Sequence, residues 1–119
     1  MGPFRDSWTE ADVEAVLARG NPADLLYVPL VVSLDPPDCD WAEAICVQLA
    51  AHSDFTVRGN AILGFGHLAR TCGRLTEAVV RPIIQAALRD EHPFVRGHAS
   101  DVADDIEQFL GWQLKGTLA

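Results

Sequence analysis

The stretch Val57-Arg58-Gly59-Asn60-Ala61 returns almost unchanged thirty-eight residues later as Val95-Arg96-Gly97-His98-Ala99. Each copy follows an apolar helical run that ends in polar residues, and each copy opens a second helical run. A helix, a tight turn and a second helix therefore form the repeated unit. A repeat of this length is typical of α-solenoids, in which each hairpin buries its apolar face by stacking on its neighbours.

The second copy resembles the HEAT-repeat family, which has an aspartate in the turn and an arginine six residues later. The resemblance covers roughly residues 41–112, and the first copy departs from it by having His52 where the turn aspartate should stand. It implies that Arg58 and Arg96 are framework residues that bond the turns, with Arg96 and Asp90 as the expected pair. The matching residues of the second copy are Leu88, Asp90, Pro93, Val95, Arg96 and Ala99.

The repeat predicts an all-α protein, a short right-handed α-solenoid of about six helices in three hairpins. Residues 1–119 would form one HEAT-like domain, with a degenerate first hairpin over 7–34, a second over 41–73 and a third over 75–112. Ser7 and Asp40 each precede a glutamate by three residues, which predicts capping boxes at the starts of two helices. We expect Pro29 to kink or split the second helix, and Pro82 to kink or delay the fifth.

The fourth predicted helix carries three glycines, each costing up to about 1 kcal/mol relative to alanine. Gly59, Gly64 and Gly66 fall within eight residues. Close approach of a neighbouring helix would explain them, and room for a side chain of a partner is the alternative.

Cysteine count and hydropathy predict a cytoplasmic protein with free thiols. Cys39, Cys46 and Cys72 are odd in number and lie in no paired spacing. The first residues do not combine a basic segment with an apolar one, and no apolar run approaches the roughly 18 residues that a membrane span needs.

The net charge of −8 indicates which kinds of partner the protein could bind. Nine basic residues stand against seventeen acidic ones, whereas proteins that track phosphates concentrate lysine and arginine. Nucleic-acid binding is therefore disfavoured and a basic partner is favoured. The alternative is that the surplus acid keeps a small protein soluble.

The candidate binding face consists of the outward residues of the fourth and sixth predicted helices, which the family resemblance places on the concave side. Three carboxylates fall within five residues of the sixth helix, and no pairing partner lies among them on that helix. They predict an electrostatic docking surface for a cationic partner, with a merely solvated face as the alternative. The predicted partner-binding residues are Asn60, His67, Arg70, His98, Asp101, Asp104, Asp105 and Gln108.

Catalysis and metal binding have little support in the sequence. His98, Asp101 and Asp105 share one side of a helix, and His67 could approach them, yet helical spacing of this kind arises often by chance. No zinc motif, phosphate loop or nucleophile elbow accompanies them. We therefore expect no enzyme activity, no metal and no cofactor.

A compact acidic domain of this architecture resembles the small immunity proteins of bacterial contact-dependent and polymorphic toxin systems. That resemblance implies a monomer that forms a 1:1 complex with a basic, nuclease-type toxin domain, and no contact with nucleic acid or membrane. One alternative is an adaptor or scaffold subunit of a larger complex. The other is a HEAT-like DNA glycosylase, which would need a basic concave face.

Overall fold

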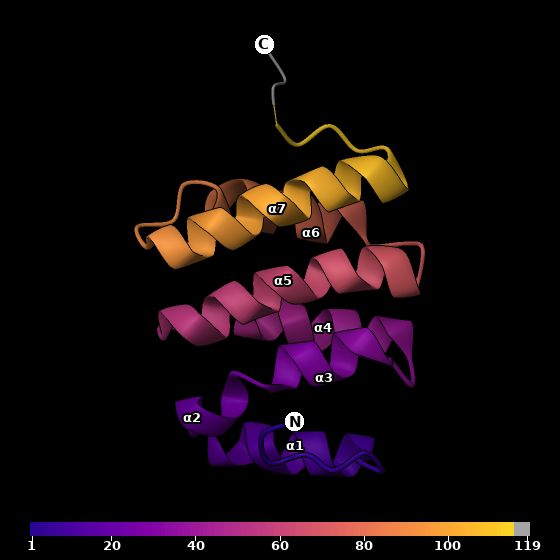
Figure 1. Ribbon diagram of the computed structural model, residues 1–119, viewed down its shortest axis with the longest axis vertical. Coiled ribbons are helices and arrows are strands. Elements are labelled where there is room, and N and C mark those ends of the chain that lie inside the picture. Colours follow the sequence, from indigo (N-terminus) through magenta and orange to yellow (C-terminus); the bar gives the residue numbers. More distant parts are fainter. Residues whose placement is uncertain (116–119) are drawn as a thin grey trace.

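The computed structural model describes residues 1–115, and all its regular elements there are helices, so the predicted all-α class is confirmed. In Figure 1, α3, α5 and α7 lie side by side in one layer, with α4 and α6 behind them and α1 near the N-terminal end. Within the described residues, no helix is both long and apolar enough to cross a membrane. The helices are α1 (Glu10–Arg19), α2 (Pro22–Leu25), α3 (Val28–Leu34), α4 (Cys39–Leu49), α5 (Phe55–Thr71), α6 (Glu77–Ala87) and α7 (Pro93–Leu110).

The structure repeats at the same interval as the sequence. Helix α6 begins and ends thirty-eight residues after α4, and α7 begins thirty-eight residues after α5. Their N-caps correspond as well, since Asp38 and Thr76 precede α4 and α6, and Asp54 and His92 precede α5 and α7. The repeated unit is therefore one helical hairpin present twice. The right-handed solenoid path stays a prediction.

The first hairpin contains three helices where two were expected. Proline has no backbone N–H to donate within a helix, and Pro29 accordingly falls in the first turn of a new helix, α3. The predicted split is confirmed, and it raises the helix count of residues 1–115 to seven. Gly20 ends α1 with a φ of 69°, a left-handed conformation that glycine adopts without steric cost.

Both predicted capping boxes are misplaced. Helix α1 is capped by Thr9, whose hydroxyl accepts from the Asp12 N–H while the Asp12 carboxylate accepts from the Thr9 N–H. Helix α4 is capped by Asp38, which accepts from the Trp41 N–H at 2.9 Å. In each case a second capping residue two positions away competed with the predicted one, and periodicity alone could not rank them.

Pro82 lies inside α6, which nevertheless begins at Glu77, so the helix start is not delayed. A proline at this point removes one hydrogen bond from the helix interior. The helix keeps its place because its buried residues, Val80, Ile84 and Ala87, hold it against the core.

The glycines of α5 allow close packing on three sides, which confirms that expectation. A Cβ on Gly64 would lie 2.7 Å from Cys46 Sγ and 3.3 Å from the backbone oxygen of Pro29. A Cβ on Gly66 would lie 3.1 Å from Val102, and one on Gly59 would lie 2.5 Å from the ring of Phe94. Helix α5 is therefore the central element, packed against α3, α4 and α7.

The free-thiol prediction is wrong for two of the three cysteines. Cys39, at the start of α4, and Cys72, at the end of α5, form a disulfide. Their spacing of 33 residues carries no local signal, since the fold alone brings the two ends together. Cys46 is free and buried, and burial raises the pKa of its thiol to about 12.

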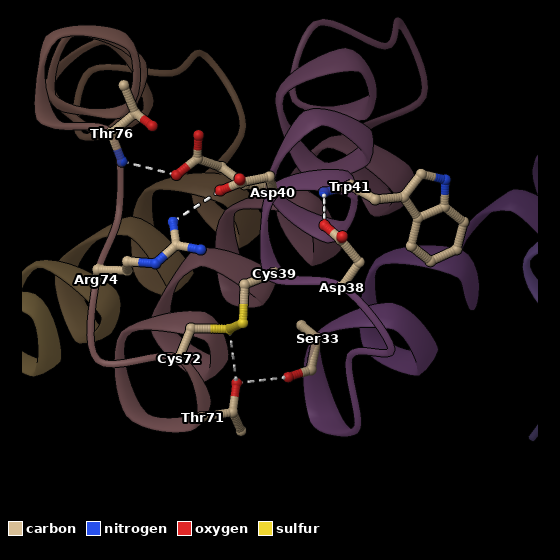
Figure 2. The surroundings of a disulfide bond; sticks show 10 residues. Ser33, Asp38, Cys39, Asp40, Trp41, Thr71, Cys72, Arg74 and Thr76 are labelled. Atoms are coloured by element: carbon tan, nitrogen blue, oxygen red, sulfur yellow. Dashed lines mark hydrogen bonds and ion pairs between the residues drawn. A yellow bond between two sulfur atoms is a disulfide. The ribbon is translucent and has the colours of Figure 1, made fainter.

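Further contacts surround the disulfide (Figure 2). The Arg74 guanidinium pairs with Asp40 at 2.7 Å, and the Thr76 N–H donates to Glu43 at 2.7 Å. The Thr71 hydroxyl donates to the Ser33 carbonyl at 3.1 Å, which joins α5 to the end of α3. This end of the second hairpin is thus held by a covalent bond and several polar contacts.

Candidate partner-binding face

The turns that precede α5 and α7 hold the start of each helix through side-chain hydrogen bonds. In the first copy, His52 Nδ1 accepts the Asp54 N–H at 2.9 Å, and in the second, Asp90 Oδ1 accepts the His92 N–H at 2.9 Å. The side chains of Asp54 and His92 then cap α5 and α7 respectively. Histidine and aspartate have thus exchanged positions between the copies. The side-chain acceptor in the turn is His52 in the first copy and Asp90 in the second, and the helix cap is the other residue type in each. His52 therefore replaces the turn aspartate as a hydrogen-bond acceptor.

The predicted Arg96–Asp90 ion pair is not formed. Arg58 takes the Asp90 carboxylate instead, through two hydrogen bonds of 2.7 and 2.8 Å, while Arg96 donates to the Asp90 backbone carbonyl at 2.7 Å. The Arg58 guanidinium holds the pKa of the Asp90 carboxyl below its usual range, and the His92 N–H adds to the effect. Arg58 therefore pairs with a residue of the second copy, because the position equivalent to Asp90 is occupied in the first copy by His52.

Two of the eight predicted binding residues, both on α5, form hydrogen bonds with the α2–α3 segment. Asn60 is 8% exposed, and its amide donates to the Leu26 carbonyl at the break between α2 and α3. His67 is half-buried, and its Nδ1 lies 2.9 Å from the hydroxyl of the fully buried Ser33. Burial and the nearby Arg70 lower the pKa of His67, against the opposing effect of Asp105. Asn60 and His67 therefore fasten α5 to the α2–α3 segment.

The acidic strip of α7 is only partly paired. Asp104 forms an ion pair with Lys115 at 2.9 Å, so the expectation of wholly uncompensated carboxylates is wrong at this position. Asp101 is exposed and Asp105 half-buried, and neither makes an ion pair within residues 1–115. The sequence could not reveal the Lys115 contact, because it depends on where the chain turns after α7.

The remaining predicted residues divide between solvent and an aromatic cluster. Arg70 and Gln108 are exposed, on α5 and α7 respectively. His98 packs edge-on against Phe94 with ring centroids 4.4 Å apart. The Phe94 ring also meets Phe55, which is 40% exposed and stacks on His92 at 3.6 Å. Sequence patterns do not reveal this cluster, because Phe55 and Phe94 come directly after the turns and belong to different copies of the repeat.

His67 and Asp105 are candidate residues that the fold places near each other across the α5–α7 boundary. A Cβ on Gly66 would lie 3.5 Å from Asp105 Oδ2, and Asp105 acts electrostatically on His67. Ser33 cannot serve as a nucleophile here, since it has no exposed surface and its hydroxyl lies 3.3 Å from the Leu30 carbonyl. The described residues contain no group of three or more metal-ligating side chains.

No protein-family model, no curated protein and no solved structure matches this chain. The resemblances to HEAT repeats and to immunity proteins therefore stay predictions.

Proposed function

We propose that the protein is a protein-binding module that docks a basic partner on the α5–α7 face. The observation that carries the proposal is the exposed Asp101 and the half-buried Asp105 on the long helix α7, neither of which forms an ion pair within residues 1–115. Carboxylates on a rigid helix speed and orient association with a positively charged surface. Arg70, on the neighbouring helix, adds a positive charge, so the face selects for the placement of charge as well as for its sign.

In its specific form, the proposal is an immunity protein that binds and neutralises a basic, nuclease-type bacterial toxin in a 1:1 complex. The acidic face would then cover the positively charged cleft in which such a toxin holds phosphates. This step rests on the net charge of −8 and on the exposed carboxylates. The protein itself needs no catalytic group, metal or cofactor to block a partner in this way.

Affinity capture tests the proposal. The tagged protein is purified from its own host, and the proteins retained in stoichiometric amount are identified by mass spectrometry. We expect a basic domain whose toxicity is relieved by co-expression of this chain. Recovery of a large complex without such a domain would indicate a scaffold, and recovery of nucleic acid would contradict the charge argument.

Charge reversal then locates the binding face on the captured partner. The variant Asp101→Lys/Asp105→Lys should weaken binding by more than a hundredfold, since each reversal both removes an attraction and adds a repulsion. The matched control Glu14→Lys/Asp24→Lys makes the same change in net charge on α1 and α2. Equal losses in the two variants would mean that overall charge, and not this face, drives association.

The cytoplasmic location is part of the proposal, and the Cys39–Cys72 disulfide provides its test. Disulfides persist in oxidising compartments and are rare in the cytosol. Rapid acid quenching followed by alkylation of whole cells would report the state of both thiols. Alkylated Cys39 and Cys72 would support a cytoplasmic protein, whereas protection of both would place it in an oxidising compartment and the partner with it.

A further inference from the structure

A second surface lies between the segment that precedes α1 and the end of α3. Two adjoining cavities of about 340 and 180 Å³ share Asp6, Trp8 and Asp35 in their walls and so form one groove. The N-terminal segment and α3 are neighbours near the α1 end of the molecule (Figure 1).

The larger half of the groove is open to solvent, and both apolar and charged residues line it. Leu34, the last residue of α3, is 48% exposed, and Met1 is 54% exposed, which is high for large apolar side chains. Phe4 and Val31 are buried and line the same cavity. Arg5 adds a positive charge to this wall. An exposed apolar surface next to a cavity is typical of a binding site for an apolar side chain.

The smaller half is acidic. Asp6 and Asp35 are joined there by Glu10, and all three carboxylates are exposed. Within residues 1–115, none of the three makes an ion pair or a side-chain hydrogen bond.

Nearby carboxylates behave differently, which sets these three apart. Asp12 and Asp38 accept backbone N–H groups at helix starts, and Asp40 pairs with Arg74. Helix capping and ion pairing thus explain the positions of Asp12, Asp38 and Asp40. No hydrogen bond or ion pair within residues 1–115 explains the three carboxylates of the groove. Asp35 also follows the C-terminus of α3, where a negative charge is unfavourable to the helix.

Trp8 borders both halves. It is half-buried, so part of its ring remains accessible beside the carboxylates. An indole ring attracts a cation over its face, and the attraction adds to that of neighbouring carboxylates. The groove thus offers an apolar half, an aromatic border and an acidic half in sequence.

We propose that this groove binds a peptide segment of a partner protein in which a bulky apolar residue adjoins a lysine or arginine. The apolar side chain occupies the half lined by Leu34 and Phe4, and the cation lies by Trp8 among Asp6, Glu10 and Asp35. Charge complementarity selects this occupant, since phosphates and acidic peptides are repelled by the carboxylates. The proposal is independent of the α5–α7 face.

The test is a titration of the full chain with two short peptides, acetyl-Ser-Leu-Arg-Leu-Ser-amide and its counterpart with glutamate in place of arginine. The Trp8 indole N–H resonance is assigned with a Trp8→Phe variant and followed by NMR. We expect the basic peptide to shift this resonance and to bind at least tenfold more tightly than the acidic one. Raising the salt from 0.05 to 0.5 M should weaken its binding.

Variants complete the test. Asp6→Asn/Asp35→Asn keeps the shape of both side chains and should reduce affinity for the basic peptide about tenfold, while Glu14→Gln/Asp24→Asn, outside the groove, should leave it unchanged. Equal affinity for the two peptides would overturn the proposal. So would unchanged binding in Asp6→Asn/Asp35→Asn, shifts confined to residues away from Trp8, or no binding at millimolar peptide.

Discussion

The two copies of the repeated hairpin, α4–α5 and α6–α7, begin their helices at equivalent residues and differ in the contacts that stabilise the ends of the hairpin. At the turn end, each arginine donates to a backbone carbonyl of its own turn, and Arg58 of the first copy also pairs with Asp90 of the second. Arg96 is exposed and forms no ion pair within residues 1–115. A repeat arginine therefore contributes an ion pair only where a following copy supplies an acid.

At the opposite end, the difference is covalent. The first copy joins Cys39 to Cys72, and the equivalent positions of the second copy are Glu77 and Leu110. There, Arg81 pairs with Glu77, donates to the Gln113 carbonyl at 2.7 Å and lies over the Trp112 ring. The first copy is thus closed by a bond, and the second by an arginine and an aromatic ring.

Removal of the disulfide is expected to have the largest effect. Cys39→Ser/Cys72→Ser frees a loop of 33 residues in the unfolded chain, which should lower the free energy of unfolding by about 3 kcal/mol. Urea denaturation of both proteins, with and without reductant, measures the loss. Reductant should lower the midpoint of the native protein alone, and an unchanged midpoint would show that the bond contributes no stability.

Much of this comparison could be predicted from the sequence, and the rest depended on distant neighbours. The repeated Val-Arg-Gly stretch predicted the helical hairpins, and Pro29 predicted the break between α2 and α3. The Cys39–Cys72 bond, the Asp104–Lys115 pair and the Arg58–Asp90 pair join residues that local patterns do not connect. For the candidate face, helical periodicity predicted the exposure of Asp101. The burial of Asn60 could not be predicted, because it depends on where the fold places the Leu26 carbonyl.

Substitution of the framework arginines should have the next largest effect on stability, and the loss should be greater for Arg58 than for Arg96. Arg58→Met breaks a largely buried bidentate pair and should cost about 2 to 3 kcal/mol, since the Asp90 carboxylate loses its partner. Arg96→Met removes one exposed contact and should cost less than about 1 kcal/mol. Thermal or urea unfolding compares the two variants, and equal losses would remove the distinction between the copies.

The equivalent glycines Gly59 and Gly97 should respond with opposite signs. Gly59→Ala would press a methyl group against the Phe94 ring and should destabilise the protein by about 1 to 2 kcal/mol. Gly97→Ala meets no atom within 4 Å and should stabilise α7 by about 0.5 to 1 kcal/mol. Midpoints of urea unfolding measure both changes. Stabilisation by both substitutions would contradict the close approach of α5 and α7.

Lowering the pH should have the smallest of the predicted effects on stability, and it should act in two separate pH ranges. His67 has a pKa below its usual 6.5 in the fold, so the unfolded chain takes up a proton first and stability falls as pH drops below 6.5. Asp90 has a pKa below its usual 3.8, so its contribution is complete above that value and is lost as pH falls further.

His67→Asn separates the two ranges, because its amide can still reach Ser33 but does not titrate. The variant should lose the pH dependence that His67 adds below pH 6.5 and keep the decline at lower pH. Free energies of unfolding between pH 8 and pH 3 provide the comparison with the native protein. A pH profile identical to that of the native chain would exclude a contribution from His67.

A double-mutant cycle tests most directly the claim that the two copies are joined by one ion pair between them. Arg58→Met and Asp90→Asn are measured singly and together by urea unfolding, and Arg96→Met with Asp90→Asn forms the matched cycle. We predict a coupling of about 2 kcal/mol between Arg58 and Asp90 and one near zero between the Arg96 and Asp90 side chains. The reverse result, with the coupling in the Arg96 cycle, would restore the pairing inferred from the HEAT resemblance and contradict the structure.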